Sequence, residues 1–285
     1  MSRYKLRANY DIENIDSQKM DGTVIVDVPM LSNGELNYGL SHIKKKLYEE
    51  NVYPSEIGFD IMSLATMVYM ADTRIERVVH GQDSWTREIE LEIPVSNVEI
   101  WDSQIRTVER MLKFLTGDLW KITLSSRAWQ FNNLEVVREK SNKYDEVSLF
   151  SGGMDSLIST INLMENKKNT LLISHAGEGL TKNAQKNIVN KFDLLYPDVL
   201  HTWLDLWMVF PRDYIPAGGN DNNTRSRSFL FIGYALFAMT GMDNINELLV
   251  PENGLIALNV PLDETRVGSF STRTTHFIFL CGMNY

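Results

Sequence analysis

The chain is poor in cysteine and has no long apolar run. Cys281 is the only cysteine among 285 residues, which excludes an internal disulfide and a zinc site built from several cysteines. No stretch approaches the roughly 18 consecutive apolar residues that a membrane-spanning helix needs. The first residues also lack the apolar segment of a secretion signal. We therefore expect a cytoplasmic protein without a membrane partner.

Positive charge is scarce as well. Lysine and arginine total 28 against 37 aspartate and glutamate residues, so the net charge is −9. A chain with this charge is poorly suited to bind a nucleic-acid backbone, and we expect no direct nucleic-acid partner. The hydrophobic share of 44% and the charged share of 23% indicate a packed core and exclude a disordered chain. At roughly 150 residues per domain, the length suggests two domains.

The first half mixes patterns of extended and helical structure. Strand patterns, either alternating or β-branched, cover residues 4–10, 23–28, 89–95 and 120–124. One helix is predicted over 57–69, and a second begins at Asp102 as its N-cap and ends at Gly117. No catalytic motif is found here. We interpret residues 1–143 as an α+β N-terminal domain with a structural or partner-binding role.

The second half, residues 144–285, has a different organisation. Short buried-type strands alternate with helices, which is typical of an α/β fold with a parallel, doubly wound sheet and flanking helices. The strand patterns cover residues 147–150, 170–174, 199–206 and 247–250, and the helical patterns 155–165, 184–192 and 226–239. Ligands bind at the carboxyl ends of such strands, so the loops that follow the strands are the expected site of chemistry. The loop 217–223 is predicted to be mobile, either a lid or a surface excursion.

A glycine-rich hexapeptide follows the first of these strands. It consists of Ser151, Gly152, Gly153, Met154, Asp155 and Ser156. The glycines let backbone N–H groups approach an anion, the serines add hydroxyl donors, and the following helix adds its positive N-terminal dipole. Asp155 is predicted to hold a magnesium ion next to a bound diphosphate. The alternative is an ordinary strand-to-helix turn in which serine and aspartate cap the helix.

The hexapeptide resembles the signature loop of the PP-loop ATP pyrophosphatases, which cleave ATP between its α and β phosphates. The resemblance implies a HUP-type sheet. Within that superfamily, residues 146–276 are most similar to QueC, the 7-cyano-7-deazaguanine synthases, and especially to the QueC-like QatC proteins of the Qat anti-phage defence system. The segments that carry this resemblance are residues 151–156, 174–179, 225–231, 251–262 and 268–276.

The resemblance implies an ATP-dependent ligase or synthase. Its reaction would adenylate the carboxylate of 7-carboxy-7-deazaguanine, release pyrophosphate and pass the acyl group to an amine. The amine is ammonia in the synthases, whereas the defence branch suggests an amine of a partner protein, such as a QatB-like protein. A different amidating ATP pyrophosphatase and a non-catalytic QueC-like scaffold remain the alternatives. Thiolation is disfavoured by the single cysteine.

The same resemblance assigns roles to individual residues. ATP and pyrophosphate are expected to contact the hexapeptide and His175, and catalysis is assigned to Asp155, Arg227 and Arg273. Substrate binding is assigned to Glu252, Asn253, Arg266, Thr272 and His276. His175 is equally consistent with a loop residue whose hydrogen bonds are satisfied, Arg225 and Arg227 with exposed residues at a helix start, and Glu252 and Asn253 with a turn.

One departure from the family concerns zinc. QueC proteins have a C-terminal zinc site built from several cysteines, and this sequence has only Cys281. We therefore expect ATP and Mg²⁺ as cofactors but no zinc, and a catalytic domain that is shortened at its C-terminal end.

Overall fold

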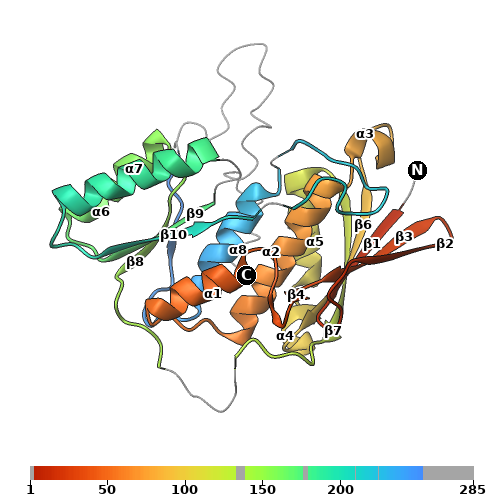
Figure 1. Cartoon of the computed structure of the whole chain (residues 1–285), viewed down its shortest axis with the longest axis horizontal. Helices are drawn as coiled ribbons and strands as arrows, with labels where there is room; N and C mark the ends of the chain where they lie inside the picture. Colours follow the sequence, from red (N-terminus) through yellow and green to blue (C-terminus); the bar gives the residue numbers. More distant parts are fainter. Residues whose placement is uncertain (1–2, 133–138, 176–178, 209, 224, 253–285) are drawn as a thin grey trace, which may run out of the picture.

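The computed structural model describes residues 3–132, 139–175, 179–208, 210–223 and 225–252. Two β-sheets lie on opposite sides of a central pair of helices, α2 (Glu56–Arg74) and α8 (Arg227–Met239) (Figure 1). α2 contacts strands of the first sheet, and α8 contacts strands of the second. In the described part of the chain, no helix has the length and apolar character needed to cross a membrane.

The first sheet has five strands in the described residues, in the order β2-β3-β1-β6-β7. All pairs are parallel except β2 with β3. The bounds are β1 (Arg3–Asn9), β2 (Asp16–Met20), β3 (Thr23–Pro29), β6 (Glu88–Val95) and β7 (Leu119–Ser126). On β6, buried apolar side chains alternate with partly exposed glutamates, as the alternating sequence predicts.

Shorter elements complete the N-terminal half. They are β4 (Leu31–Ser32), β5 (Glu35–Leu36), α1 (Leu40–Glu49), α3 (Arg77–His80), α4 (Val98–Asp102) and α5 (Ile105–Thr116). The predicted N-cap at Asp102 is wrong, because Asp102 is the last residue of α4 and α5 has Gln104 at its N-cap. The Asn97 side chain accepts a hydrogen bond from the Ile100 N–H and so starts a separate helical turn earlier in the chain. The predicted end of α5 at Gly117 is confirmed, and this glycine is left-handed with φ of 83°.

The second sheet is parallel throughout, with described strands in the order β10-β9-β8-β11. Its strands are β8 (Glu146–Leu149), β9 (Thr170–His175), β10 (His201–Leu206) and β11 (Leu248–Leu249), and α6 (Met154–Glu165) and α7 (Gly179–Leu195) connect the first three. α6 and α7 lie together on one face, and α8 covers the other (Figure 1). The prediction of an α/β fold with parallel strands and flanking helices is confirmed. The strand order reverses between β8 and β11, which is where open sheets of this type bind ligands.

The two central helices approach each other closely. A Cβ atom on Gly58 of α2 would lie 2.2 Å from the Thr240 hydroxyl, and one on Gly233 of α8 would lie 2.8 Å from the Ala65 Cβ atom. One continuous cluster of buried apolar side chains includes residues from both sheets and both helices. The predicted boundary at residue 143 falls between β7 and β8. The division into two domains stays a prediction.

A buried ionic network lies near the C-terminal end of α2. Both Arg77 and Arg87 contact the Asp118 carboxylate, with shortest N–O distances of 2.6 and 2.7 Å, and Asp118 is fully buried. Asp72 and Asp221 complete the network. Asp221 belongs to the loop 217–223, which was predicted to be mobile.

That loop is held against the end of α2. The Gly218 carbonyl accepts a hydrogen bond of 2.7 Å from the Glu76 N–H, and the Asp221 N–H donates to the Thr73 carbonyl at 3.1 Å. Asn223 donates to the Asp72 carbonyl at 3.0 Å. These bonds tie the described residues of the loop to the N-terminal half. The mobility of the loop stays a prediction.

Candidate functional site

The glycine-rich loop begins where β8 ends. Gly152 has φ of 81°, a left-handed conformation that glycine adopts without steric cost. A Cβ atom at this position would also lie 2.9 Å from Cγ of Gln185. Gly153 is extended, with φ of −85°, and forms the N-cap of α6. Glycine is therefore required at 152 for two reasons, whereas neither reason applies at 153.

The two serine hydroxyls hold the loop in shape. Ser156 accepts a hydrogen bond of 3.1 Å from the Gly152 N–H and donates one of 2.9 Å to the Gly153 carbonyl. Ser151 accepts a hydrogen bond of 3.2 Å from the Gly153 N–H, and the two hydroxyl oxygens are 3.2 Å apart. These hydroxyls are thus occupied within the loop.

The N-terminus of α6 supplies the groups that suit an anion. The first N–H groups of a helix have no acceptor within the helix and carry its partial positive charge. Met154 and Asp155 begin this helix and are exposed, Met154 by 72%. A phosphate group can reach such an end without displacing core side chains.

Gln185 is a residue of the site that sequence reasoning missed. It is fully buried on α7, and its side-chain amide donates a hydrogen bond of 3.0 Å to the Ser151 carbonyl. Its Oε1 atom is buried and has no hydrogen-bond partner in the described part of the chain. The available signal was a polar residue within the apolar stripe that continues through Val189 and Phe192 at helical spacing.

Asp155 and Glu252 both lie beside the point where the strand order reverses. Asp155 follows β8, and Glu252 follows β11. Burial and the negative charge of Asp155 raise the pKa of the Glu252 carboxyl. A divalent cation between two such carboxylates removes their repulsion, and Mg²⁺ in phosphate sites is commonly bound by one or two carboxylates. This pair therefore fits Mg²⁺.

The rest of the coordination shell would have to come from the ligand. No group of three or more His, Cys, Asp or Glu side chains that could hold a metal occurs within the described ranges. The carboxylate pair alone supplies too few oxygens for the six positions around Mg²⁺, and phosphate oxygens and water would supply the others.

His175 ends β9 and is fully buried. Its ring packs edge-on against Tyr69 and Phe231, with centroid distances of 5.6 Å to each. Its Nε2 atom lies 3.3 Å from the Met208 carbonyl, and its Nδ1 atom has no hydrogen-bond partner among the residues that the structure describes. Burial and the positive charge of Arg227 lower the pKa of His175 to about 4. The ring is therefore neutral at pH 7 and contributes no charge to phosphate binding.

The structure separates the two arginines at the start of α8. Arg227 donates a hydrogen bond of 3.1 Å to the His175 carbonyl, which places its guanidinium at the carboxyl end of β9. Arg225 donates to the Thr116 carbonyl at 2.7 Å and lies over the Trp85 ring at 4.7 Å. Arg227 lies at the edge of the second sheet, whereas Arg225 is bound to the N-terminal half.

A lysine pair adds positive charge at the same edge. Asp205, near the end of β10, forms ion pairs with Lys46 of α1 and Lys182 of α7. Burial raises the pKa of Asp205, but the two lysines outweigh this effect and the pKa is lowered overall. Lys46 and Lys182 thus share the Asp205 carboxylate, and Lys182 lies about one helical turn before Gln185 on α7. Sequence reasoning missed this local positive charge.

The remaining predicted residues are not part of the described structure. Asn253, Arg266, Thr272, Arg273 and His276 lie outside the described residues, and their roles stay predictions.

Comparison with protein-family models found no match, and comparisons with curated proteins and with solved structures found no match either.

Proposed function

We propose that the chain is a PP-loop ATP pyrophosphatase of the QueC-like type, built on a HUP-type sheet. One observation carries this proposal. The loop 151–156 lies where the strand order reverses, at the N-terminus of α6, and Glu252 follows the neighbouring strand β11. A diphosphate on an exposed helix end next to two carboxylates needs a divalent cation.

Individual residues of the chain would have separate roles in this reaction. Asp155 and Glu252 hold Mg²⁺, which offsets phosphate charge, and Gly152 keeps the loop backbone close to the ligand. Arg227 is the guanidinium placed to stabilise charge on departing pyrophosphate, since it lies at the carboxyl end of β9. Gln185 would position the loop through its hydrogen bond to the Ser151 carbonyl.

The proposed substrate is 7-carboxy-7-deazaguanine. Its carboxylate oxygen attacks the α phosphorus of ATP, and the bond to pyrophosphate breaks. An amine then attacks the acyl carbon, and AMP leaves with the bonding electrons. The amine comes from a QatB-like partner protein in anti-phage defence or, alternatively, from ammonia in a free synthase. The motif segments at 174–179, 225–231 and 251–262 support this choice.

The test measures pyrophosphate release by the full chain with ATP, Mg²⁺ and 7-carboxy-7-deazaguanine, with and without ammonia or the neighbour-encoded partner. Intact mass of the partner reports conjugation. Asp155→Asn should abolish release, whereas Asp198→Asn, at an exposed position away from the loop, should not change it. Release that does not depend on the deazaguanine acid would contradict the substrate but not the nucleotide site.

One observation favours a non-catalytic scaffold as the second candidate. Both serine hydroxyls of the loop are occupied within the loop itself, as in an ordinary strand-to-helix turn. Calorimetric titration with Mg²⁺ and ATP distinguishes the two functions. Absence of binding would support the scaffold, and saturable binding that Asp155→Asn removes would support the enzyme.

A further inference from the structure

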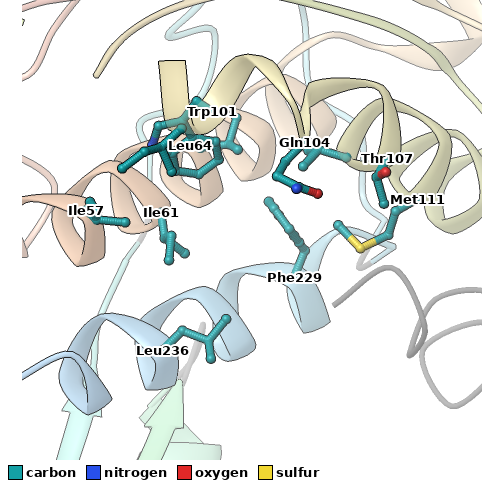
Figure 2. A pocket seen from close by; sticks show the side chains of 11 residues that line it. Ile57, Ile61, Leu64, Trp101, Gln104, Thr107, Met111, Phe229 and Leu236 are labelled. Atoms are coloured by element: carbon teal, nitrogen blue, oxygen red, sulfur yellow. The ribbon is translucent and has the colours of Figure 1, made fainter. Parts of the chain in front are cut away.

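A recess with a volume of about 230 Å³ lies between α2, α4, α5 and α8. Figure 2 shows Gln104, at the N-cap of α5, and Met111 facing Phe229 of α8, while Ile61 of α2 faces Leu236 of α8. The recess is therefore built by helices from both halves of the chain. It is separate from the loop 151–156, none of whose residues lines it.

The lining of this recess is uncharged. Eleven described residues line it, and nine of them are apolar. The other two, Gln104 and Thr107, are polar but neutral. A charged group that enters such a recess loses its hydration and finds no opposite charge in the lining, which is strongly unfavourable. The chemistry of the lining therefore selects an uncharged ligand.

The recess is deep, and little of its lining is exposed. Leu64, Met111 and Phe229 are each 3% exposed, whereas Ile57 is 37% and Ile100 is 50% exposed. The two isoleucines thus form the mouth, and the other three side chains form the floor. A stable protein interface buries about 800 Å² on each partner, far more than two isoleucines offer. The recess therefore suits a small molecule and not a protein segment.

Aromatic side chains indicate the shape of the ligand. Trp101 of α4 and Phe229 of α8 both line the recess. Aromatic rings pack favourably against one another in offset or edge-on arrangements. An apolar cavity of about 150 Å³ holds a benzene ring. A recess of about 230 Å³ has room for a larger ligand, and we take two fused aromatic rings as its size.

The two polar residues of the lining lie on the same face of α5. Gln104 and Thr107 are three residues apart, and Val108 and Met111 continue this face toward the end of the helix. The Gln104 side chain does not cap the helix, although this residue is the N-cap. Its amide and the Thr107 hydroxyl can each donate and accept hydrogen bonds. One polar group on an otherwise apolar ligand would therefore find partners on this side.

We propose that the recess binds a small, uncharged aromatic molecule of two fused rings, with one hydrogen-bonding group directed at Gln104 and Thr107. The ligand would contact Phe229, which lies on the same helix as Arg227 of the proposed nucleotide site. The recess contains no residue of that site, so either proposal can fail without the other.

The test is calorimetric titration of the full chain with naphthol, naphthalene and naphthoate, which share one ring system. We expect naphthol to bind with a stoichiometry of one molecule per chain. Naphthalene should bind about fivefold more weakly, because it lacks the hydrogen bond. Naphthoate should bind at least about a hundredfold more weakly, because its charge is unpaired in the recess. Absence of naphthol binding, or naphthoate binding of equal strength, overturns the proposal.

Variants of the lining place the binding in the recess. Ile100→Asp puts a charge at the mouth and should weaken naphthol binding at least about tenfold. Ile158→Asp is the matched control, since Ile158 is 51% exposed on α6, and it should leave binding intact. Equal effects of these two variants would place the ligand elsewhere and overturn the proposal.

A second variant tests the polar side of the recess. Gln104→Met combined with Thr107→Val removes both polar groups and keeps side chains of similar size. Naphthol should then bind no more tightly than naphthalene, while naphthalene binding stays unchanged. A preference for naphthol that survives in this variant would show that these two residues do not receive the polar group.

Discussion

The buried side-chain amide of Gln185 donates a hydrogen bond of 3.0 Å to the backbone carbonyl of Ser151. Helix α7, which follows α6 and β9 in the chain, thus holds Ser151, the first residue of the glycine-rich loop. The Cγ atom of the same glutamine lies 2.9 Å from the position that a Cβ atom on Gly152 would take. The shape of the loop therefore depends on a side chain outside the motif.

The first prediction concerns the two glycines of the loop. Gly152→Ala should lower the free energy of unfolding by about 1–2 kcal/mol, because a left-handed conformation is unfavourable for alanine and its Cβ meets Gln185 at 2.9 Å. Gly153→Ala is the matched control, since its nearest contact is an ordinary 3.4 Å to the Ser151 hydroxyl. Chemical denaturation measures both. Equal destabilisation by the two variants would contradict the described loop geometry.

The second prediction concerns pH and His175. The pKa of this ring falls from 6.5 to about 4 on folding. Between these values the unfolded chain takes up a proton that the folded chain does not, so stability falls as the pH drops through this window, by about 3 kcal/mol in total. His175→Gln should flatten the dependence between pH 6.5 and 4, measured by urea denaturation.

The control for this experiment is His42→Gln. His42 is exposed on α1, and its replacement should keep the pH dependence of the wild-type protein. Burial also lowers the pKa of His80. The difference between the wild type and His175→Gln isolates His175, because His80 is present in both. An unchanged slope in His175→Gln would show that this ring is protonated equally in both states.

The third prediction concerns the buried ionic network. Asp118→Asn keeps the shape of the side chain but removes the charge that faces both Arg77 and Arg87, and it should cost about 3 kcal/mol of stability. Glu90→Gln removes a partner from a partly exposed pair with Lys121, at 3.5 Å, and should cost less than about 1 kcal/mol. Thermal and denaturant unfolding measure both variants. Similar losses in the two would mean that Asp118 is accessible to water.

The fourth prediction concerns the carboxylate pair. Asp155→Asn removes a negative charge that raises the pKa of Glu252, so the Glu252 carboxyl should titrate at lower pH in this variant. Carboxyl carbon shifts in NMR spectra report the titration directly. Glu247→Gln removes an exposed charge just before β11 and should leave the titration unchanged. If Asp155→Asn does not shift Glu252, the two carboxylates are too far apart to share a cation.

Much of the second sheet was predictable, because buried parallel strands are short apolar runs that alternate with helices. The same rule places the residues after Leu149 and Leu249 at one edge, and it therefore anticipates that Asp155 and Glu252 lie at the same edge of the sheet. Gly152 was predictable as well, since a left-handed turn requires glycine. These features follow from local patterns and from one rule about where strand ends lie.

Other features depend on contacts between distant segments, which no local pattern encodes. Arg225 and Arg227 look equivalent in sequence, yet one turns to Thr116 and the other to His175. Gln185 and Lys182 acquire their roles only because α7 packs beside the end of β8. Asp102 has the side chain of an N-cap, but Asn97 starts α4 first and leaves Asp102 at its end.

The close approach of α2 and α8 limits how the molecule can move. Gly58 of α2 lies against Thr240, and Gly233 of α8 lies against Ala65. Each helix therefore has a glycine whose missing side chain leaves room for the other helix or its end. Hinge bending between the sheets would drive these backbones into their neighbours' side chains. The fit of α2 against α8 therefore fixes the distance between the two helices and, through them, the arrangement of the two sheets.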